Sequence, residues 1–182
     1  MGAIVAAVSK KNENVVPQVV VMLKELTHRG VDAHGIAIPN LVSATRSLEE
    51  LMAENVESPI ALGHNLSKIF PRDRPQPVQG KAFSLVFEGR FFPCPNIPEV
   101  DEVVEMLKPD PQGNAARIIE KLDGSFAFAV AYPDRVLAGR DALGTKSLYY
   151  GENETTCAMA SERKALWAVS YTHLTLPTNR EV

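Results

Sequence analysis

The sequence predicts an α+β fold built around antiparallel sheets. In residues 126–131 two phenylalanines and a valine alternate with three alanines, so both faces of an extended chain are apolar. Such a strand is covered on both sides, and its alanine face lets a neighbouring layer approach closely. A second apolar run, residues 3–8, predicts another buried strand. Turn residues at 133–134 and 141–144 separate further short strands, which is typical of antiparallel connections.

The N-terminal half is predicted to alternate strands with short helices. Asn14 and Pro17 are typical of a helix start, and Gly30 can end that helix in a left-handed conformation. Ser47 and Glu50 form a capping box at the start of a second helix. Apolar patterning predicts a hairpin over 36–38 and 41–44, a strand pair or bent strand over 60–69, and a strand over 82–87.

The C-terminal half is predicted to contain two helices and then strands. The helices cover 99–107 and 115–122, and proline-rich loops over 70–80 and 90–98 precede them. Four short segments then follow at close spacing, which predicts an antiparallel meander over 126–131, 135–139, 148–150 and 156–160.

Length and composition fit one soluble domain. The chain has 182 residues, 45% hydrophobic and 23% charged, which allows a single core of ordinary composition. A net charge of −3 gives no argument for binding nucleic acid or an anionic membrane. The longest apolar run is far below the roughly 20 residues of a membrane helix. Two cysteines, Cys94 and Cys157, fit a reducing cytosol, so we expect a cytoplasmic location.

Three motifs near the C-terminus are specific enough to indicate a family. They are LDGSFAFAV at 122–130, GRDALGTKSLYYG at 139–151, which includes Arg140, Asp141, Gly144 and Lys146, and ASERKAL at 160–166. They resemble the class II glutamine amidotransferase domain of asparagine synthetases in wording, order and spacing, with Ser147 in place of the usual proline. The resemblance covers residues 1–169 and implies an N-terminal-nucleophile hydrolase fold, a four-layer αββα sandwich of two antiparallel sheets. We expect the 3–8 strand to lie centrally in it.

The resemblance places the catalytic centre at the start of the chain, where the required residue is missing. In the family, Met1 is removed and a cysteine at the second position becomes the nucleophile, with its own α-amine as the base. Here the second residue is Gly2, which has no side chain to carry an acyl group. The sequence therefore predicts no catalytic nucleophile.

The pocket motifs of the family are altered as well. HRGPDxxG is present with only its proline changed to valine, which retains His28, Arg29, Gly30, Asp32 and Gly35. The family segment that grips the substrate carboxylate aligns with residues 63–69 and puts Asn65 at the arginine position. The neutral amide of asparagine cannot make the two charge-assisted hydrogen bonds that an arginine guanidinium makes to a carboxylate.

The family's oxyanion-hole segment is altered in the same way. FNGEIYN aligns with residues 87–92, which puts Glu88 at the oxyanion asparagine, keeps Gly89, and puts Arg90 at the glutamate that holds the substrate ammonium. The family's next aspartate corresponds to Asp101 or Glu102. Four changes in one pocket predict a degenerate glutamine site.

Other candidate sites have weaker support. Residues 139–146 nearly match a phosphate-binding loop, but Thr145 separates the lysine from the glycine and a strand follows, so a connecting turn is favoured. The histidines have no metal-ligand spacing, and we predict no metal or cofactor in this domain. Cys94 is interpreted as an incidental thiol. Arg29 and Asp32 are expected to form a structural ion pair.

The favoured hypothesis is a non-catalytic domain that supports or regulates an asparagine-synthetase-type protein. Its expected partner is a C-terminal synthetase domain of the same chain, absent from these 182 residues, which would hold ATP and Mg²⁺; a homodimer is a further possibility. The alternative is an active glutaminase that supplies ammonia for asparagine synthesis. A third hypothesis is an independent binding protein whose altered pocket takes an anionic or neutral ligand.

Residues 170–182 do not follow the pattern of the rest. They show no amphipathic periodicity and resemble a translated adapter or vector read-through, so we expect an unstructured tail that adds no strand to the core. On that hypothesis the natural protein continues beyond Val169 and the sequence is a fragment.

Overall fold

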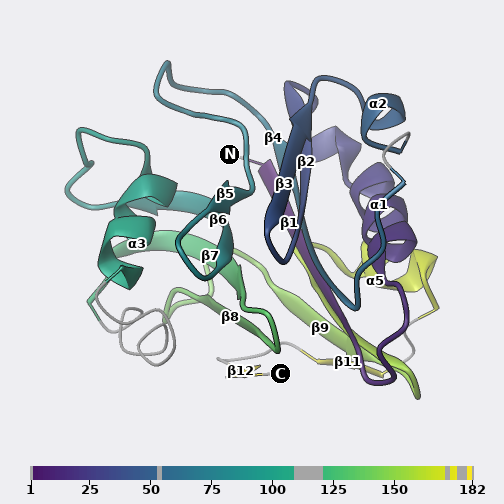
Figure 1. Cartoon of the computed structure of the whole chain (residues 1–182). Coiled ribbons are helices and arrows are strands. Elements are labelled where there is room, and N and C mark those ends of the chain that lie inside the picture. The colour runs from purple at the N-terminus through teal and green to yellow at the C-terminus, as the bar shows by residue number, and fades with distance from the viewer. Residues whose placement is uncertain (1, 53–54, 109–120, 171–172, 176–179, 182) are drawn as a thin grey trace.

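The computed structural model describes residues 2–52, 55–108, 121–170, 173–175 and 180–181. Two antiparallel sheets are stacked between helices, as Figure 1 shows. On the outer face of one sheet lie helices α1 (Val16–Glu25), α2 (Leu48–Met52) and α5 (Arg163–Ala168). Helix α3 (Glu99–Leu107) covers the other sheet. The predicted four-layer αββα sandwich is confirmed.

The larger sheet has seven strands in the order β11-β9-β10-β1-β4-β2-β3. Strand β1 is the fourth of the seven, so the predicted central position of the first strand is confirmed. The strands are β1 (Gly2–Ser9), β2 (Ala33–Ile38), β3 (Leu41–Thr45), β4 (Ile60–Leu66), β9 (Tyr149–Glu152), β10 (Thr156–Ala160) and β11 (His173–Thr175).

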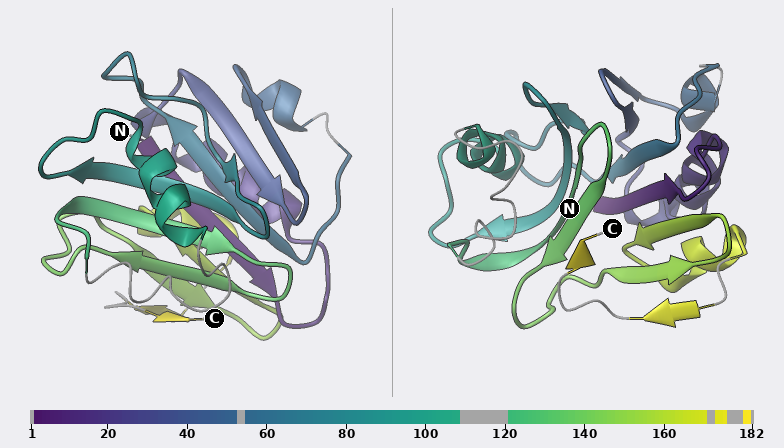
Figure 2. Two further views of the ribbon diagram at one scale, coloured as in Figure 1. Left: turned by 60° about the vertical axis from the view of Figure 1, so that its left-hand side comes forward. Right: turned by 60° about the horizontal axis from the view of Figure 1, so that its bottom comes forward.

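The smaller sheet has five strands in the order β12-β8-β7-β6-β5. Figure 2 shows how this sheet lies across the larger one. The strands are β5 (Val78–Gln79), β6 (Ser84–Phe91), β7 (Gly124–Ala131), β8 (Val136–Arg140) and β12 (Arg180–Glu181).

Strand β7 shows why the sequence packs in this way. Its alanines at 127, 129 and 131 lie between the two sheets, in a cluster that includes Ile4 and Leu62. Its larger side chains, Phe126 and Phe128 among them, face the opposite way and pack with α3. The small residues allow the sheets to approach, and the aromatic residues fill the wider space under the helix. Both features of the sequence prediction are confirmed.

Asn14 lies one residue before the N-cap of α1, which is Val15, and Gly30 does not stop this helix as predicted, whereas Ser47 contacts the helix that it was predicted to cap. Asn14 Oδ1 accepts a hydrogen bond from the backbone N–H of Val16 at 3.0 Å, and Ser47 Oγ accepts one from Glu50 at 3.2 Å. Helix α1 ends at Glu25 and is followed by the 3₁₀ turn η1 (Thr27–Arg29).

Gly30 directly follows this 3₁₀ turn in an extended conformation, with φ of −177°, and not in the predicted left-handed one. A Cβ at residue 30 would lie 2.5 Å from the carbonyl carbon of Leu66, so close packing against β4 explains the glycine. Most of the predicted 115–122 helix lies outside the described residues.

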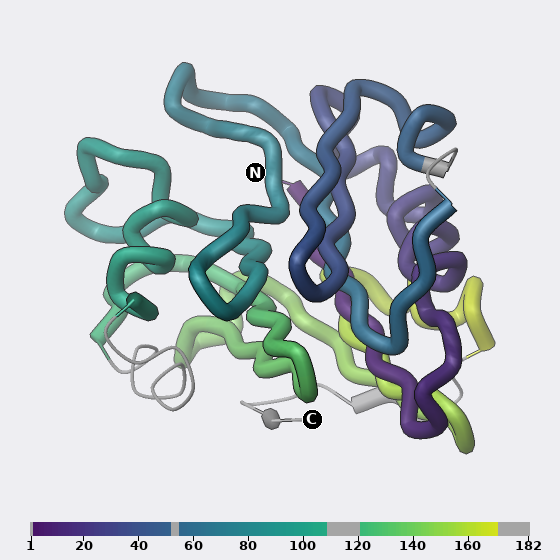
Figure 3. The backbone as a smooth tube through the Cα atoms, viewed as in Figure 1, coloured from purple at the N-terminus to yellow at the C-terminus, as the bar shows by residue number. Residues whose placement is uncertain are grey.

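The predicted four-stranded meander is wrong, because the chain changes sheets in the middle of it. Strands β7 and β8 pair in the smaller sheet, whereas β9 and β10 belong to the larger one. Between them, the buried Asp141 carboxylate accepts hydrogen bonds from the backbone N–H groups of Phe126, Thr145 and Lys146. Gly144 takes the left-handed conformation with φ of 64°. This turn redirects the chain from one layer to the other (Figure 3).

The expectation that residues 170–182 add no strand is also wrong. Strand β11 pairs with β9 and strand β12 pairs with β8, so the segment extends both sheets by one short edge strand. Backbone pairing needs no side-chain periodicity, which is why the sequence pattern missed it. Within the described part of the chain, no helix has the length and apolar character needed to cross a membrane.

Candidate functional site

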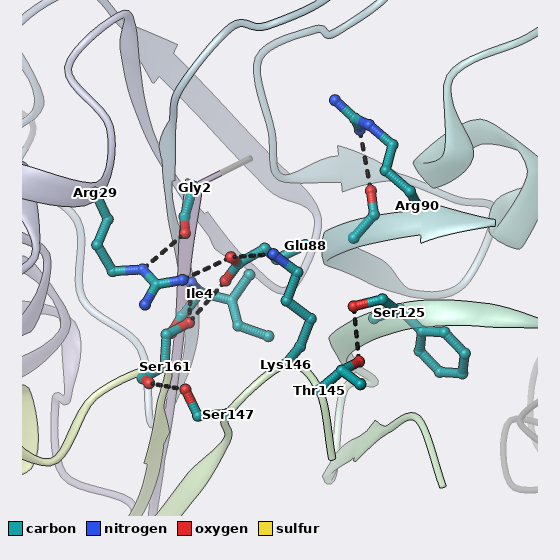
Figure 4. Close-up of polar contacts among 12 residues, drawn as sticks. Gly2, Ile4, Arg29, Glu88, Arg90, Ser125, Thr145, Lys146, Ser147 and Ser161 are labelled. Carbon is teal, nitrogen blue, oxygen red and sulfur yellow. Dashed lines mark hydrogen bonds and ion pairs between the residues drawn. The ribbon is translucent and has the colours of Figure 1, made fainter. Parts of the chain in front are cut away.

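Glu88 of β6 lies at the centre of a buried polar network beside the start of β1 (Figure 4). Its Oε1 atom lies 2.7 Å from Nη2 of Arg29 and 3.3 Å from Nζ of Lys146. Its Oε2 atom accepts a hydrogen bond from Ser161 Oγ at 3.2 Å. The carboxylate side chain has no exposed surface, so its charge is compensated by these neighbours and not by water.

Arg29 joins this carboxylate to the first residues of the chain. Its Nε donates to the carbonyl oxygen of Gly2 at 3.0 Å, and its Nη1 lies 3.1 Å from Glu162 Oε1. Burial acts to lower the pKa of Arg29, but the charges of Glu88 and Glu162 outweigh it, so the pKa is raised and the guanidinium stays charged. The expected pair between Arg29 and Asp32 is therefore not formed.

Asp32 has a different partner. Its carboxylate accepts a hydrogen bond from the backbone N–H of Lys68 at 2.7 Å, which holds the chain as it leaves β4. His28 lies at the surface, with Nε2 2.9 Å from Glu162 Oε1. Gly35 is needed for close packing, because a Cβ there would lie 2.0 Å from the carbonyl oxygen of Gln76. These motif residues organise the walls of the site.

Gly2 begins β1 and has little space for a side chain. An ideal Cβ at this position would lie 2.0 Å from the backbone carbonyl oxygen of Asn65 and 3.3 Å from His64 Nε2. A backbone atom cannot move aside as a flexible side chain can. Any larger residue at position 2 therefore requires β1 and β4 to shift.

The expectation that the Asn65 side chain lies in the pocket is wrong. Asn65 is fully buried on the helix side of β4, where Oδ1 lies 2.7 Å from His34 Nδ1 and Nδ2 donates to the carbonyl oxygen of Leu23 at 2.8 Å. Because side chains alternate along a strand, His64 and Leu66 face the other way and line the polar cavity. Leu66, and not Asn65, is therefore the β4 residue after His64 that a ligand in the cavity would meet.

Arg90 lines this cavity and is already paired. Its Nη2 contacts both carboxylate oxygens of Asp73 at 2.8 Å, and its Nη1 lies 3.4 Å from Glu99 Oε2. Burial acts to raise the pKa of Asp73, but backbone hydrogen bonds and the Arg90 charge outweigh it and lower the pKa. Gly89, in the same wall, has φ of 153°, and a Cβ there would lie 2.3 Å from the carbonyl oxygen of Ser125.

The acidic residue that α3 presents to the cavity is Glu99, which the sequence analysis missed. Asp101, the expected residue, is paired instead with Arg74 at 2.9 Å and does not line the cavity. The cavity has a volume of about 30 Å³. That is room for no more than one or two water molecules, and far less than an amino acid needs.

His64 is also buried in the wall of this cavity. Burial holds its pKa at about 3, so the imidazole is neutral at physiological pH. A neutral imidazole adds no charge to a cavity in which acidic and basic side chains already pair with one another.

The segment that resembles a phosphate-binding loop is a connecting turn, as predicted. The backbone N–H groups of Thr145 and Lys146 point to the Asp141 carboxylate, so they are not available to a phosphate. Burial acts to raise the pKa of Asp141, but these hydrogen bonds outweigh it and lower the pKa. Arg140 lies over the left-handed Gly144, where an added Cβ would be 2.7 Å from its guanidinium. Among the described residues no three His, Cys, Asp or Glu side chains are grouped as metal ligands.

The stacked antiparallel sheets between helices and the central first strand define the class of fold. It is the fold of solved glutamine amidotransferases, and the sequence is similar to that of an asparagine synthetase. Residues 100–168 match the family described as glutamine amidotransferase domain. Over 158 residues the chain is 29% identical to a Methanocaldococcus jannaschii protein assigned as asparagine synthetase (glutamine-hydrolyzing) 1. The match covers 80% of this chain and 29% of that protein, so the chain spans less than a third of its relative.

Solved structures agree on the fold. The glutamine phosphoribosylpyrophosphate amidotransferase of B. subtilis superimposes with a TM-score of 0.69 at 17% identity, covering 96% of this chain and 45% of that one. A structure described as the allosteric regulatory enzyme of purine biosynthesis superimposes with a TM-score of 0.75 at 16% identity. The match again covers 96% of this chain and 45% of that one. A glutamine aminotransferase class-II domain protein from Silicibacter pomeroyi gives 0.55 at 12% identity, covering 96% of this chain and 90% of that one.

Proposed function

We propose that this domain has no glutaminase activity and serves as a structural or regulatory module of an asparagine-synthetase-type protein. The observation that carries the proposal is the pairing of Glu88 with Arg29 and Lys146 directly beside a second residue that has no side chain. A buried ion-pair network occupies the region where the chemistry of an active relative would take place.

The first support is the missing nucleophile. Glutamine hydrolysis by this class proceeds through an acyl-enzyme, which requires a side-chain thiol or hydroxyl next to a base. Gly2 offers neither, and the free thiols Cys94 and Cys157 lie on the 92–98 loop and on β10, away from the start of β1.

The second support is the electrostatics at Glu88. An ionised carboxylate accepts hydrogen bonds and cannot donate one to a developing oxyanion, and its negative charge opposes that oxyanion. Arg29 and Lys146 are engaged by the carboxylate, so their charges are already compensated. The arrangement stabilises a buried anion of the protein itself.

The third support is the cavity. Asn65, the residue expected at the carboxylate clamp, faces away from the cavity, and Arg90 stands where the family has an anion for the substrate ammonium. The volume of about 30 Å³ excludes an amino acid in this conformation.

The parent protein on this proposal is an ATP-dependent, amide-forming enzyme of the cytoplasm. Its synthetase domain would hold ATP and Mg²⁺ and would use free ammonia or another nitrogen source. The homology to an asparagine synthetase more than three times the matched length supports this context. The alternative, a working glutaminase, is supported by the same homology but requires a nucleophile that this chain lacks.

Ammonia release from glutamine by the purified full chain tests the proposal directly. We expect no release above a no-protein blank over hours at millimolar glutamine, and no change in melting temperature on adding glutamine. A separately purified active class II glutaminase serves as the assay control. Turnover that scales with protein concentration and survives repeated purification would overturn the proposal.

A further inference from the structure

Strand β8 of the smaller sheet and strand β9 of the larger sheet lie next to the last strand on the same side of the sandwich. The outer edge of each pairs with a short strand. Strand β11 pairs with β9, with His173 opposite Glu152 and Thr175 opposite Tyr150. Strand β12 pairs with β8, with Arg180 opposite Ala138. Figures 1 and 2 place both short strands beside the C-terminus, below the sandwich in the first view.

The two edges are close enough for one segment to reach both. Only five residue steps separate Thr175 from Arg180, and a fully extended chain covers about 18 Å in that length. Two stacked sheets are typically about 10 Å apart. The separation along the sequence is therefore long enough for β11 and β12 to pair with edges in different layers.

The edges themselves favour pairing through the backbone. An uncovered edge strand presents a row of unpaired N–H and C=O groups that another extended chain can complete. Gly139 and Gly151 leave little side-chain bulk on these two strands, and both are buried. The strands that pair with these edges are only three and two residues long, so backbone pairing is their main contact with the sheets.

We propose that the neighbouring edges of β8 and β9 form a strand-acceptor site that binds extended polypeptide through main-chain hydrogen bonds. In this chain β11 and β12 occupy the site, and their pairing fastens the two sheets to each other. The ligand class is an extended peptide segment with little dependence on its side chains.

Hydrogen exchange of the full chain, followed by mass spectrometry, tests this site one edge at a time. Successive N–H groups of a strand point to opposite sides, so replacing two consecutive residues by proline removes one ladder donor in either register. The double variant Leu174→Pro with Thr175→Pro should raise exchange in residues 149–152 roughly tenfold or more, and leave residues 136–140 unchanged. Arg180→Pro with Glu181→Pro should have the reverse effect.

Matched double-alanine variants at the same positions keep the backbone N–H groups and should retain the exchange pattern of the parent chain. Exchange in β1 and β4, which pair with each other elsewhere in the larger sheet, reports whether each variant keeps its fold. The proposal is overturned if the proline pairs leave both edges as protected as before. It is equally overturned if the alanine pairs expose the edges as much as proline does.

Discussion

Glu88 Oε1 and Arg29 Nη2 lie 2.7 Å apart, although 59 residues separate them in the sequence. Glu88 belongs to the smaller sheet, whereas Arg29 lies in the turn before β2 of the larger sheet and also donates to the Gly2 carbonyl at the start of β1. This pair therefore connects the two layers beside the start of the first strand.

Replacing Glu88 by glutamine should reduce the free energy of unfolding by about 3 kcal/mol. The amide keeps the size of the side chain but leaves Arg29 and Lys146 facing a neutral group, and breaking a buried ion pair typically costs about 3–5 kcal/mol. Urea unfolding at pH 7 measures the change. Glu105→Gln on α3, whose carboxylate is 59% exposed and pairs with Lys108, is the control and should stay within about 0.5 kcal/mol. Equal losses of unfolding free energy in the two variants would contradict a stabilising role of the ion pairs of Glu88.

Gly2→Cys alone should not create a glutaminase. The new Cβ would meet the Asn65 carbonyl, and Glu88 would still oppose an oxyanion; loss of one oxyanion donor costs roughly 10²–10³ in rate. The combination of Gly2→Cys, Leu66→Arg, Glu88→Asn and Arg90→Glu should release more ammonia than Gly2→Cys. The assay uses protein whose Met1 is shown by mass spectrometry to be removed. Robust turnover by the single variant would show that the pocket is still competent.

Asn65→Ala should destabilise the protein by about 2 kcal/mol. The substitution removes the buried partner of His34 and a hydrogen bond to the Leu23 carbonyl, and a buried group left without its partner costs roughly 1–3 kcal/mol. Asn55→Ala, on an exposed loop, is the matched control with an expected change within about 0.5 kcal/mol. A neutral result at residue 65 would indicate that its side chain faces solvent in the cavity, as the sequence alignment alone suggested.

Stability should fall as the pH is lowered from 6.5 to 5, in part because of His64. Its folded-state pKa of about 3 lies below the unfolded value near 6.5, so in this window the unfolded chain binds a proton that the native protein does not. The contribution is present above pH 6.5 and is lost at up to about 1.4 kcal/mol per pH unit below it. Urea unfolding should show a shallower pH slope for His64→Gln. Titration of the His64 ring by NMR gives an independent check, and a midpoint above pH 6 would contradict the prediction.

The sequence by itself determined the fold class and the buried strands at its centre. The two apolar faces of residues 126–131 specify a strand covered on both sides, and the alanine face specifies close stacking of the sheets, because side-chain size and a period of two are local properties. The sequence alone likewise shows that position 2 is a glycine, which has no side chain.

Tertiary structure decided which residues meet. The change of sheet after β8 depends on hydrogen bonds from backbone N–H groups to the Asp141 carboxylate. The pairing of β11 and β12 depends on backbone groups that every residue possesses. Whether Asn65 or Leu66 faces the cavity depends on the register of β4 against its neighbours, where a shift of one residue reverses every side chain. The pairing of Arg29 with Glu88, and not with Asp32, follows from the stacking of two sheets, a contact between distant segments that no local pattern records.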